Sequence, residues 1–142
     1  MGDCDDSYDF TNLMPFIEKL RNGYDLVMGN RYRGGIDKGA IPFSHKIGVK
    51  ALTWLGNIIY KTKLGDYHCG PRGFNKNKII QLNLECTGMD FASEIILKCA
   101  KENYKIKEIP TTLKKDGRNG PAHLRTIKDG ILHVKCLLKY RW

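Results

Sequence analysis

The sequence lacks the features that mark several large classes of protein. It has no apolar run long enough to span a bilayer and no recognisable signal peptide. Its five cysteines are widely spaced and odd in number, and no Cys-x-x-Cys pair occurs, so a zinc site is not predicted. Internal repeats and low-complexity segments are absent too. We therefore expect a folded protein in a reducing, cytoplasmic environment.

Basic residues are missing from the first ten positions, which contain four aspartates. Residues 11–142 hold all 24 Lys and Arg residues but only 11 of the 15 acidic ones, and the net charge is +9. A basic body with an acidic tip suggests an anionic partner, which leaves phosphate, nucleic acid and an anionic membrane surface as candidates.

The length of 142 residues suits one domain with a real core. Apolar periodicity and capping signals predict strands alternating with helices, an order typical of an α/β sheet. The strands are expected over 24–29 and 105–113, and the helices over about 12–21, 44–62, 76–82, 89–102 and 124–142. Loops are expected over 30–42, 65–73 and 114–121. Two or three strands make a poor sheet alone, which favours the interpretation that part of the sheet is missing.

The acidic tip contains Asp3 and Asp5, which point to the same face of an extended chain. Hard ions such as Mg²⁺ and Mn²⁺ prefer carboxylate oxygens and complete their shells with water and substrate phosphate. Asp3 and Asp5 are therefore candidate metal ligands, and Asp3 is also a candidate for orienting a nucleotide. The alternative is a solvated acidic segment.

Two glycine-rich loops carry candidate ligand-binding residues. Arg31 follows the first predicted strand, at the edge of the sheet where ligands bind in open α/β folds. The second loop contains Asp66, Gly70 and Arg72. Arginine suits bidentate contact with phosphate, and glycine lets the backbone approach a ligand closely. His68 in the same loop has no second ligand at metal spacing, and we interpret it as a polar loop residue.

Three further segments have both a functional and a purely structural interpretation. Asp90 and Glu94 share one helix face and are candidate general bases, or else a capping acid and a solvated glutamate. Arg118 lies in a basic loop that could close over a phosphate-bearing substrate, or form a solvated turn. The last predicted helix has basic and apolar faces, which fit either an anionic bilayer surface or packing against the domain.

The order of these motifs closely resembles that of the family 2 glycosyltransferases, particularly the dolichol-phosphate-mannose-synthase-like branch. The resemblance runs from Gly2–Asp9 through 25–32, 66–74 and 88–94 to Ile109-Pro110 and the basic loop, so it covers essentially the whole chain. As an ordered set these motifs are highly specific.

The resemblance implies a GT-A fold, here a partial one with a truncated mixed sheet flanked by helices. Residues 1–122 are expected to be the C-terminal part of the catalytic domain, and 123–142 a juxtamembrane-type amphipathic helix. It also implies a nucleotide-diphospho-sugar donor, inversion at the anomeric carbon and a Mg²⁺ or Mn²⁺ ion. Asp3 and Asp5 match the metal and diphosphate motif. Substrate-binding positions are matched by Arg31, Gly70, Arg72 and Arg118. Catalytic roles are expected for Asp66, Asp90 or Glu94.

Two departures from the family pattern shape the expectations. About ninety residues that bind the base and ribose precede the acidic motif in such proteins, so this chain is expected to be inactive alone. Exposure of a sheet edge would favour homo-oligomers. Ser7 and Tyr8 stand where the mannose synthases have a metal-binding Gln, so the third metal ligand is undefined.

The acceptor decides whether a base is needed. A polyprenyl phosphate is already an anion, whereas a sugar hydroxyl in a glycan acceptor would need Asp66, Asp90 or Glu94 as base. The basic body and amphipathic tail favour the lipid phosphate and a location on the inner face of the membrane. The alternative function is a non-catalytic basic module that binds nucleic acid or a membrane surface. The acidic tip and the lack of a nucleic-acid motif argue against nucleic acid.

Overall fold

The computed structural model describes residues 1–3, 5–115 and 126–141, without the side chains of residues 126 and 127. Its elements follow one another as α1 (Met14–Arg21), β1 (Leu26–Asn30), α2 (Arg31–Gly34), α3 (Phe43–Tyr60), β2 (Arg72–Phe74), α4 (Lys76–Gln81), α5 (Phe91–Lys101), β3 (Ile106–Pro110) and α6 (Thr126–Lys139).

The strands form one mixed sheet in the order β2-β1-β3. The central strand β1 runs antiparallel to β2 and parallel to β3, and its first residue, Leu26, pairs with both Phe74 and Ile106. All five residues of β1 are buried, because helices cover both faces of the sheet. The predicted α/β class, a small mixed sheet flanked by helices, is confirmed.

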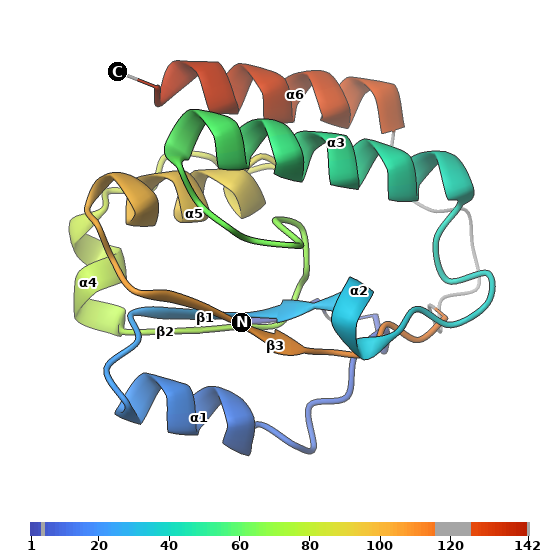
Figure 1. Cartoon of the computed structure of the whole chain (residues 1–142), viewed down its shortest axis with the longest axis horizontal. Coiled ribbons are helices and arrows are strands. Elements are labelled where there is room, and N and C mark those ends of the chain that lie inside the picture. Colours follow the sequence, from blue (N-terminus) through green and yellow to red (C-terminus); the bar gives the residue numbers. More distant parts are fainter. Residues whose placement is uncertain (4, 116–125, 142) are drawn as a thin grey trace.

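The helices are divided unequally between the two faces of the sheet (Figure 1). Helix α1 covers one face, while α5, α3 and α6 stack on the other. Helix α6 packs against α3 and α5, and its Leu137 is almost fully buried. The Tyr60 hydroxyl, at the end of α3, donates a hydrogen bond to the Leu137 carbonyl at 2.8 Å. The main core lies between the sheet and this helical layer and includes Met28, Ile95 and Ile96.

Two predicted loops contain secondary structure. Arg72 and Gly73 were expected in the 65–73 loop but belong to β2, and Arg31–Gly34 form a one-turn helix. Three residues are too few to show strand periodicity, so the pairing with β1 decides that β2 is a strand. The predicted strand over 105–113 ends at Pro110, with one further bridge between Ile36 and Leu113.

None of the helices within the described residues is long and apolar enough to cross a membrane. The assignment of 123–142 as a separate juxtamembrane segment stays a prediction, and residues 123–125 lie outside the described part of the chain.

Candidate functional site

Asp3 lies directly against Gly70. A Cβ atom built on Gly70 would overlap the Asp3 carboxylate, so this glycine lets the acidic segment pack onto the loop over 65–71, hereafter the site loop. Met1 and Arg72 hold the contact in place by exchanging backbone hydrogen bonds of 2.9 Å in both directions. Asp5 Oδ1 accepts a hydrogen bond from the Ser7 N–H at 3.1 Å. Two segments that are distant in sequence thus meet at Asp3.

Two cavities meet at this point. Cavity 1, of about 550 Å³, is lined largely by apolar residues of α3 and α6, and Arg31, His45 and His133 also face it. Cavity 2, of about 290 Å³, is bounded by the acidic segment, the site loop and the start of α5, and includes Gly70 and Arg72. Asp3, His68 and Met89 line both cavities.

Arg31 and Asp66, predicted for separate roles, form a buried bidentate ion pair with each other. Arg31 Nε and Nη2 donate to the two Asp66 oxygens at 2.6 and 2.7 Å. The same carboxylate accepts the backbone N–H groups of Arg31 and His68. Burial lowers the pKa of Arg31, but the hydrogen bonds and charge of Asp66 outweigh it and raise that pKa. This arrangement favours a positioning role for Asp66, and its catalytic role stays a prediction.

Arg72 is also buried, and its guanidinium bonds to the protein backbone. Nε donates to the Cys69 carbonyl at 3.1 Å, Nη1 to Ala92 at 2.8 Å and Nη2 to Tyr67 at 2.8 Å. Burial lowers the pKa of Arg72 to about 10, against the opposing pull of nearby Asp66 and Asp3. The residue clamps the site loop to α5 while still lining cavity 2.

The two acids at the start of α5 differ in environment. Glu94 is fully buried and accepts hydrogen bonds from the backbone of Glu85 and Cys86, the Tyr140 hydroxyl and Lys98, all at 2.8 to 2.9 Å. Burial raises its pKa, but these donors prevail and lower the pKa to about 2. Asp90 occupies the N-cap position without a side-chain capping bond. Among the described residues that line the two cavities, neither Asp90 nor Glu94 appears.

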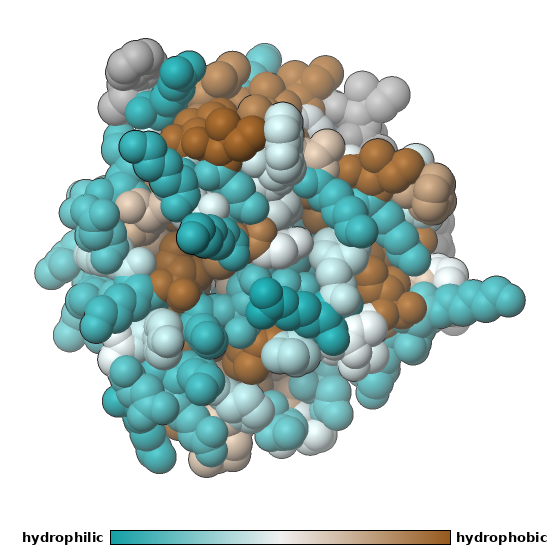
Figure 2. Space-filling model, in the orientation of Figure 1, coloured by the Kyte–Doolittle hydropathy of each residue, from teal (hydrophilic) through white to brown (hydrophobic). Residues whose placement is uncertain are grey.

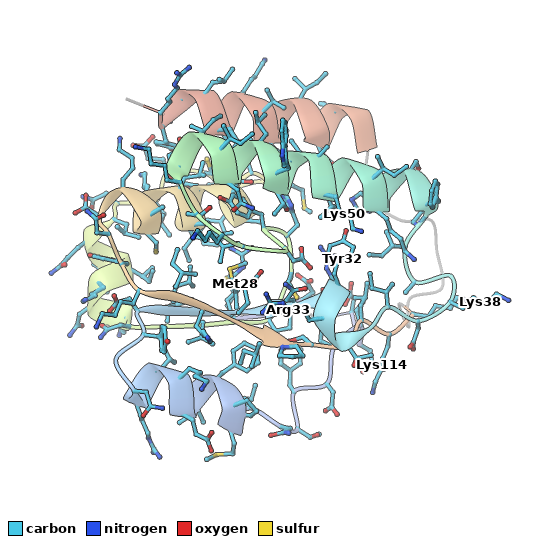
Figure 3. All side chains as sticks on the ribbon, viewed as in Figure 1. Met28, Tyr32, Arg33, Lys38, Lys50 and Lys114 are labelled. Carbon is cyan, nitrogen blue, oxygen red and sulfur yellow. The ribbon has the colours of Figure 1, made fainter. Side chains whose placement is uncertain are left out.

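Cationic side chains gather near the carboxyl ends of β1 and β3, around α2 (Figure 3). Lys50 Nζ lies 4.8 Å from the centre of the Tyr32 ring, and the Tyr32 hydroxyl donates to the Lys46 carbonyl at 3.2 Å. Arg33 and Lys114 lie in the same region, whereas the Lys38 side chain extends away from the body of the molecule in this view. Sequence reasoning did not single out Lys50, because a helical pattern alone gives no reason to do so.

A divalent ion is chemically compatible with Asp3 and Asp5, since both supply the oxygen ligands that hard ions prefer. Among the described residues there is no cluster of three or more His, Cys, Asp or Glu side chains that could hold a metal. Any ion held here would therefore take further ligands from water or substrate, as such sites usually do. Arg118, the remaining predicted site residue, lies outside the described residues.

Comparisons with known proteins place this geometry in context. No family model matches the chain. The low-salt glycan biosynthesis hexosyltransferase Agl6 of Haloferax volcanii is 36% identical over 140 residues, which make up 97% of this chain and 33% of Agl6. The chain is a homologue of glycosyltransferases.

Two further relatives from Haloferax volcanii agree. Glycosyltransferase AglJ is 26% identical over 92% of this chain and 43% of its own length. A dolichyl-phosphate hexose transferase is 28% identical over 96% of this chain and 58% of its own length. The chain thus spans between a third and three fifths of the length of these curated relatives.

Proposed function

We propose that this chain is part of an inverting family 2 glycosyltransferase that moves a hexose from a nucleotide-diphospho-sugar to a polyprenyl phosphate in glycan biosynthesis. The observation that carries the proposal is the placement of Asp3 against Gly70, where two cavities meet. The relatives named as hexosyltransferase and dolichyl-phosphate hexose transferase support a transferred hexose and a polyprenyl-phosphate acceptor.

The acidic segment is assigned to the donor diphosphate. Asp3 and Asp5 would hold Mg²⁺ or Mn²⁺, which when bound offsets charge on the departing diphosphate. Asp3 projects at the cavity junction, and Gly70 leaves room for its carboxylate. Arg31 lines cavity 1 and Arg72 lines cavity 2, and their guanidinium groups are held in place by Asp66 and by backbone carbonyls. Contact of either arginine with the substrate stays a prediction.

The buried state of two of the three candidate bases supports a phosphate acceptor. Asp90, the third, is half-buried, and its role as a base stays a prediction. Asp66 and Glu94 keep their carboxylates in saturated hydrogen-bond networks, which disfavours proton abstraction by either residue. An acceptor that is already an anion near neutral pH needs no strong base. A glycan hydroxyl acceptor would need one, which makes it the less favoured choice.

The outer surface of α3 and α6 supports a location at the cytoplasmic membrane surface. Phe43 and Trp54 are 76% and 65% exposed on α3, and Leu138 is exposed on α6. Apolar colouring appears along this side of the molecule in Figure 2. Lysines such as Lys50 and Lys135 flank these residues, and each cation near an anionic bilayer adds about 1 kcal/mol of attraction.

We further propose that the 142-residue chain binds donor weakly and does not turn it over alone, because the named relatives are much longer. Homo-oligomers are proposed from the exposed apolar side chains, and size-exclusion chromatography with light scattering tests this.

The decisive test combines binding with transfer. The chain is titrated with UDP-glucose, UDP-N-acetylglucosamine and GDP-mannose in the presence of Mn²⁺, and transfer to a short-chain polyprenyl phosphate is measured in the gene product that contains these residues. Metal-dependent transfer that Asp5→Asn abolishes is the expected result. Unchanged turnover in Asp5→Asn would overturn the assignment.

A non-catalytic basic module remains the second candidate, motivated by the net charge of +9. Filter binding to duplex DNA across a salt series distinguishes it. Steeply salt-dependent binding, without any response to nucleotide sugars, would favour this second function.

A further inference from the structure

Three polar side chains from three separate elements meet beside the cavity junction. His68 comes from the site loop, Ser93 from the first turn of α5 and His133 from α6. Ser93 Oγ lies 2.9 Å from His133 Nδ1 and 3.4 Å from His68 Nε2, and those two ring nitrogens are 3.3 Å apart. We call this group the Ser–His–His cluster.

Both imidazoles in the cluster are neutral near pH 7. Burial lowers the pKa of His68 well below its usual value, and His133, Arg72, Arg31 and His45 act in the same direction. Burial also lowers the pKa of His133, although Asp90 and Asp129 oppose that shift. The rings meet edge to face with centroids 4.3 Å apart, a contact that two positive charges would disfavour.

The second ring nitrogen of His68 is an exception to this satisfied network. His68 Nδ1 is buried and has no hydrogen-bond partner within the described part of the chain. A neutral imidazole has one N–H and one lone pair, so whichever Nε2 uses inside the cluster, Nδ1 retains the other. A buried polar atom without a partner is rare in native proteins and requires an explanation.

The position of His68 supplies an explanation for the unpartnered Nδ1 atom. Only three described residues, Asp3, His68 and Met89, line both cavities. A ligand whose diphosphate reaches Asp3 therefore lies beside the His68 imidazole. Among these three side chains, His68 offers a neutral hydrogen-bonding group, Asp3 is an acid and Met89 is apolar.

We propose that His68 binds a hydroxyl group of the transferred sugar through Nδ1 once the ring turns this buried atom toward the cavities, and that Ser93 and His133 are positioning residues. A hydroxyl can donate or accept, so it suits whichever role the cluster leaves to Nδ1, whereas a phosphate oxygen can only accept. This proposal rests on the proposed function.

The first measurement is ¹⁵N NMR of the imidazole nitrogens in the full 142-residue chain. UDP-glucose, UDP-N-acetylglucosamine and GDP-mannose are each added at millimolar concentration with Mg²⁺. The corresponding nucleoside diphosphate, UDP or GDP, is the matched control ligand that lacks the sugar. The His68 Nδ1 resonance is expected to shift with a nucleotide sugar and to stay in place with the diphosphate alone.

Paired variants separate the two ring nitrogens. The amide of His68→Asn reproduces the position of Nδ1, and that of His68→Gln reproduces the position of Nε2. His68→Gln is expected to weaken binding of the nucleotide sugar about threefold to tenfold, the worth of one neutral hydrogen bond. His68→Asn should retain most of that affinity, and neither variant should change affinity for the nucleoside diphosphate.

The positioning role of Ser93 has its own readout. Ser93→Ala removes the hydroxyl from the cluster and should change the tautomer balance of His68 seen by ¹⁵N NMR, whereas Ser93→Thr keeps the hydroxyl and should restore it. An unchanged His68 spectrum in Ser93→Ala would overturn the positioning role.

The possible outcomes distinguish this inference from the function on which it rests. Nucleotide sugars that shift the backbone resonances of Asp3 and Gly70 but not His68 Nδ1 would keep the proposed function and overturn the role of His68. Equal affinities of His68→Gln and His68→Asn would also overturn it. If no nucleotide sugar perturbs any of these resonances, both proposals fail together.

Discussion

Two groups of carboxylates in this protein are built in opposite ways. Asp66 and Glu94 are fully buried, and cations, backbone N–H groups or a tyrosine hydroxyl surround them. Asp3 is exposed and lies at the junction of two cavities, where Gly70 makes room for it. A carboxylate that stays ionised inside the fold requires a complete set of hydrogen-bonding or oppositely charged partners. A carboxylate that binds an exchangeable ligand must instead be accessible. The comparison favours scaffold roles for Asp66 and Glu94, and it supports the proposal that Asp3 contacts a ligand.

The largest effect is expected from breaking the buried ion pair. Asp66→Asn leaves the Arg31 guanidinium without its counter-charge, so the free energy of unfolding should fall by about 3 to 5 kcal/mol. Urea unfolding followed by circular dichroism measures this. The double variant Arg31→Met with Asp66→Leu removes both charges and should recover much of the loss. A change below about 1 kcal/mol in Asp66→Asn would refute the scaffold role.

Acid should weaken the fold through Glu94. Its folded-state pKa of about 2 lies below the ordinary value of 4.5, so its contribution is complete above about pH 4.5 and is lost as the pH falls toward 2. The contribution is a few kcal/mol by linkage. Unfolding free energies measured between pH 6 and 2 should fall less steeply in Glu94→Gln, which is less stable at neutral pH. Exposed Glu102→Gln at the opposite end of the same helix controls for the substitution itself. Parallel slopes in Glu94→Gln and the parent chain would contradict the assignment.

A smaller effect is expected when the acidic segment is pushed away from the site loop. Gly70→Ala places a Cβ where the Asp3 carboxylate lies, which should cost about 1 to 2 kcal/mol of stability by overpacking and weaken Mn²⁺ binding. Thermal unfolding and Mn²⁺-induced line broadening in NMR report the two effects. Gly130→Ala in α6 meets no atom within 4 Å and should leave the fold as stable or slightly more stable. Equal Mn²⁺ affinities in the Gly70→Ala and Gly130→Ala variants would show that Gly70 is not part of the proposed metal site.

The smallest effect on stability is expected at Asp3. Asp3→Asn should change the free energy of unfolding by less than about 0.5 kcal/mol because the residue is exposed. The Mn²⁺ affinity of the Asp3→Asn variant should fall at least about tenfold, because mutating even a residue that only orients a metal ligand typically lowers metal affinity by that factor. A stability loss in Asp3→Asn as large as that in Asp66→Asn, with Mn²⁺ affinity retained, would give Asp3 a structural role and contradict its proposed contact with a ligand.

Local pattern predicted much of the secondary structure. Helix α3 was expected over 44–62 and occupies Phe43–Tyr60, and α5 was expected over 89–102 and occupies Phe91–Lys101. Long amphipathic helices repeat their signal over several turns, which explains this success. Strand β2 was missed because its three residues are defined by pairing with β1.

The candidate site was predicted less completely. The sequence indicated Arg31 and Asp66 as separate functional residues, but pairing between positions 35 residues apart is invisible in a local pattern. His68 was interpreted as a polar loop residue because its partners, Ser93 and His133, lie 25 and 65 positions away. No spacing rule joins residues from a loop and two helices.

The sequence by itself determined the α/β alternation, the positions of the long helices and the resemblance to glycosyltransferases, because each is written in periodicity or in the order of short motifs. Only the tertiary structure decided which charges neutralise one another, which carboxylate lines a cavity and which histidine nitrogen has no partner among the described residues. Those properties depend on distances between elements and on exclusion of water, and both arise only when the sheet and its helical layer pack together.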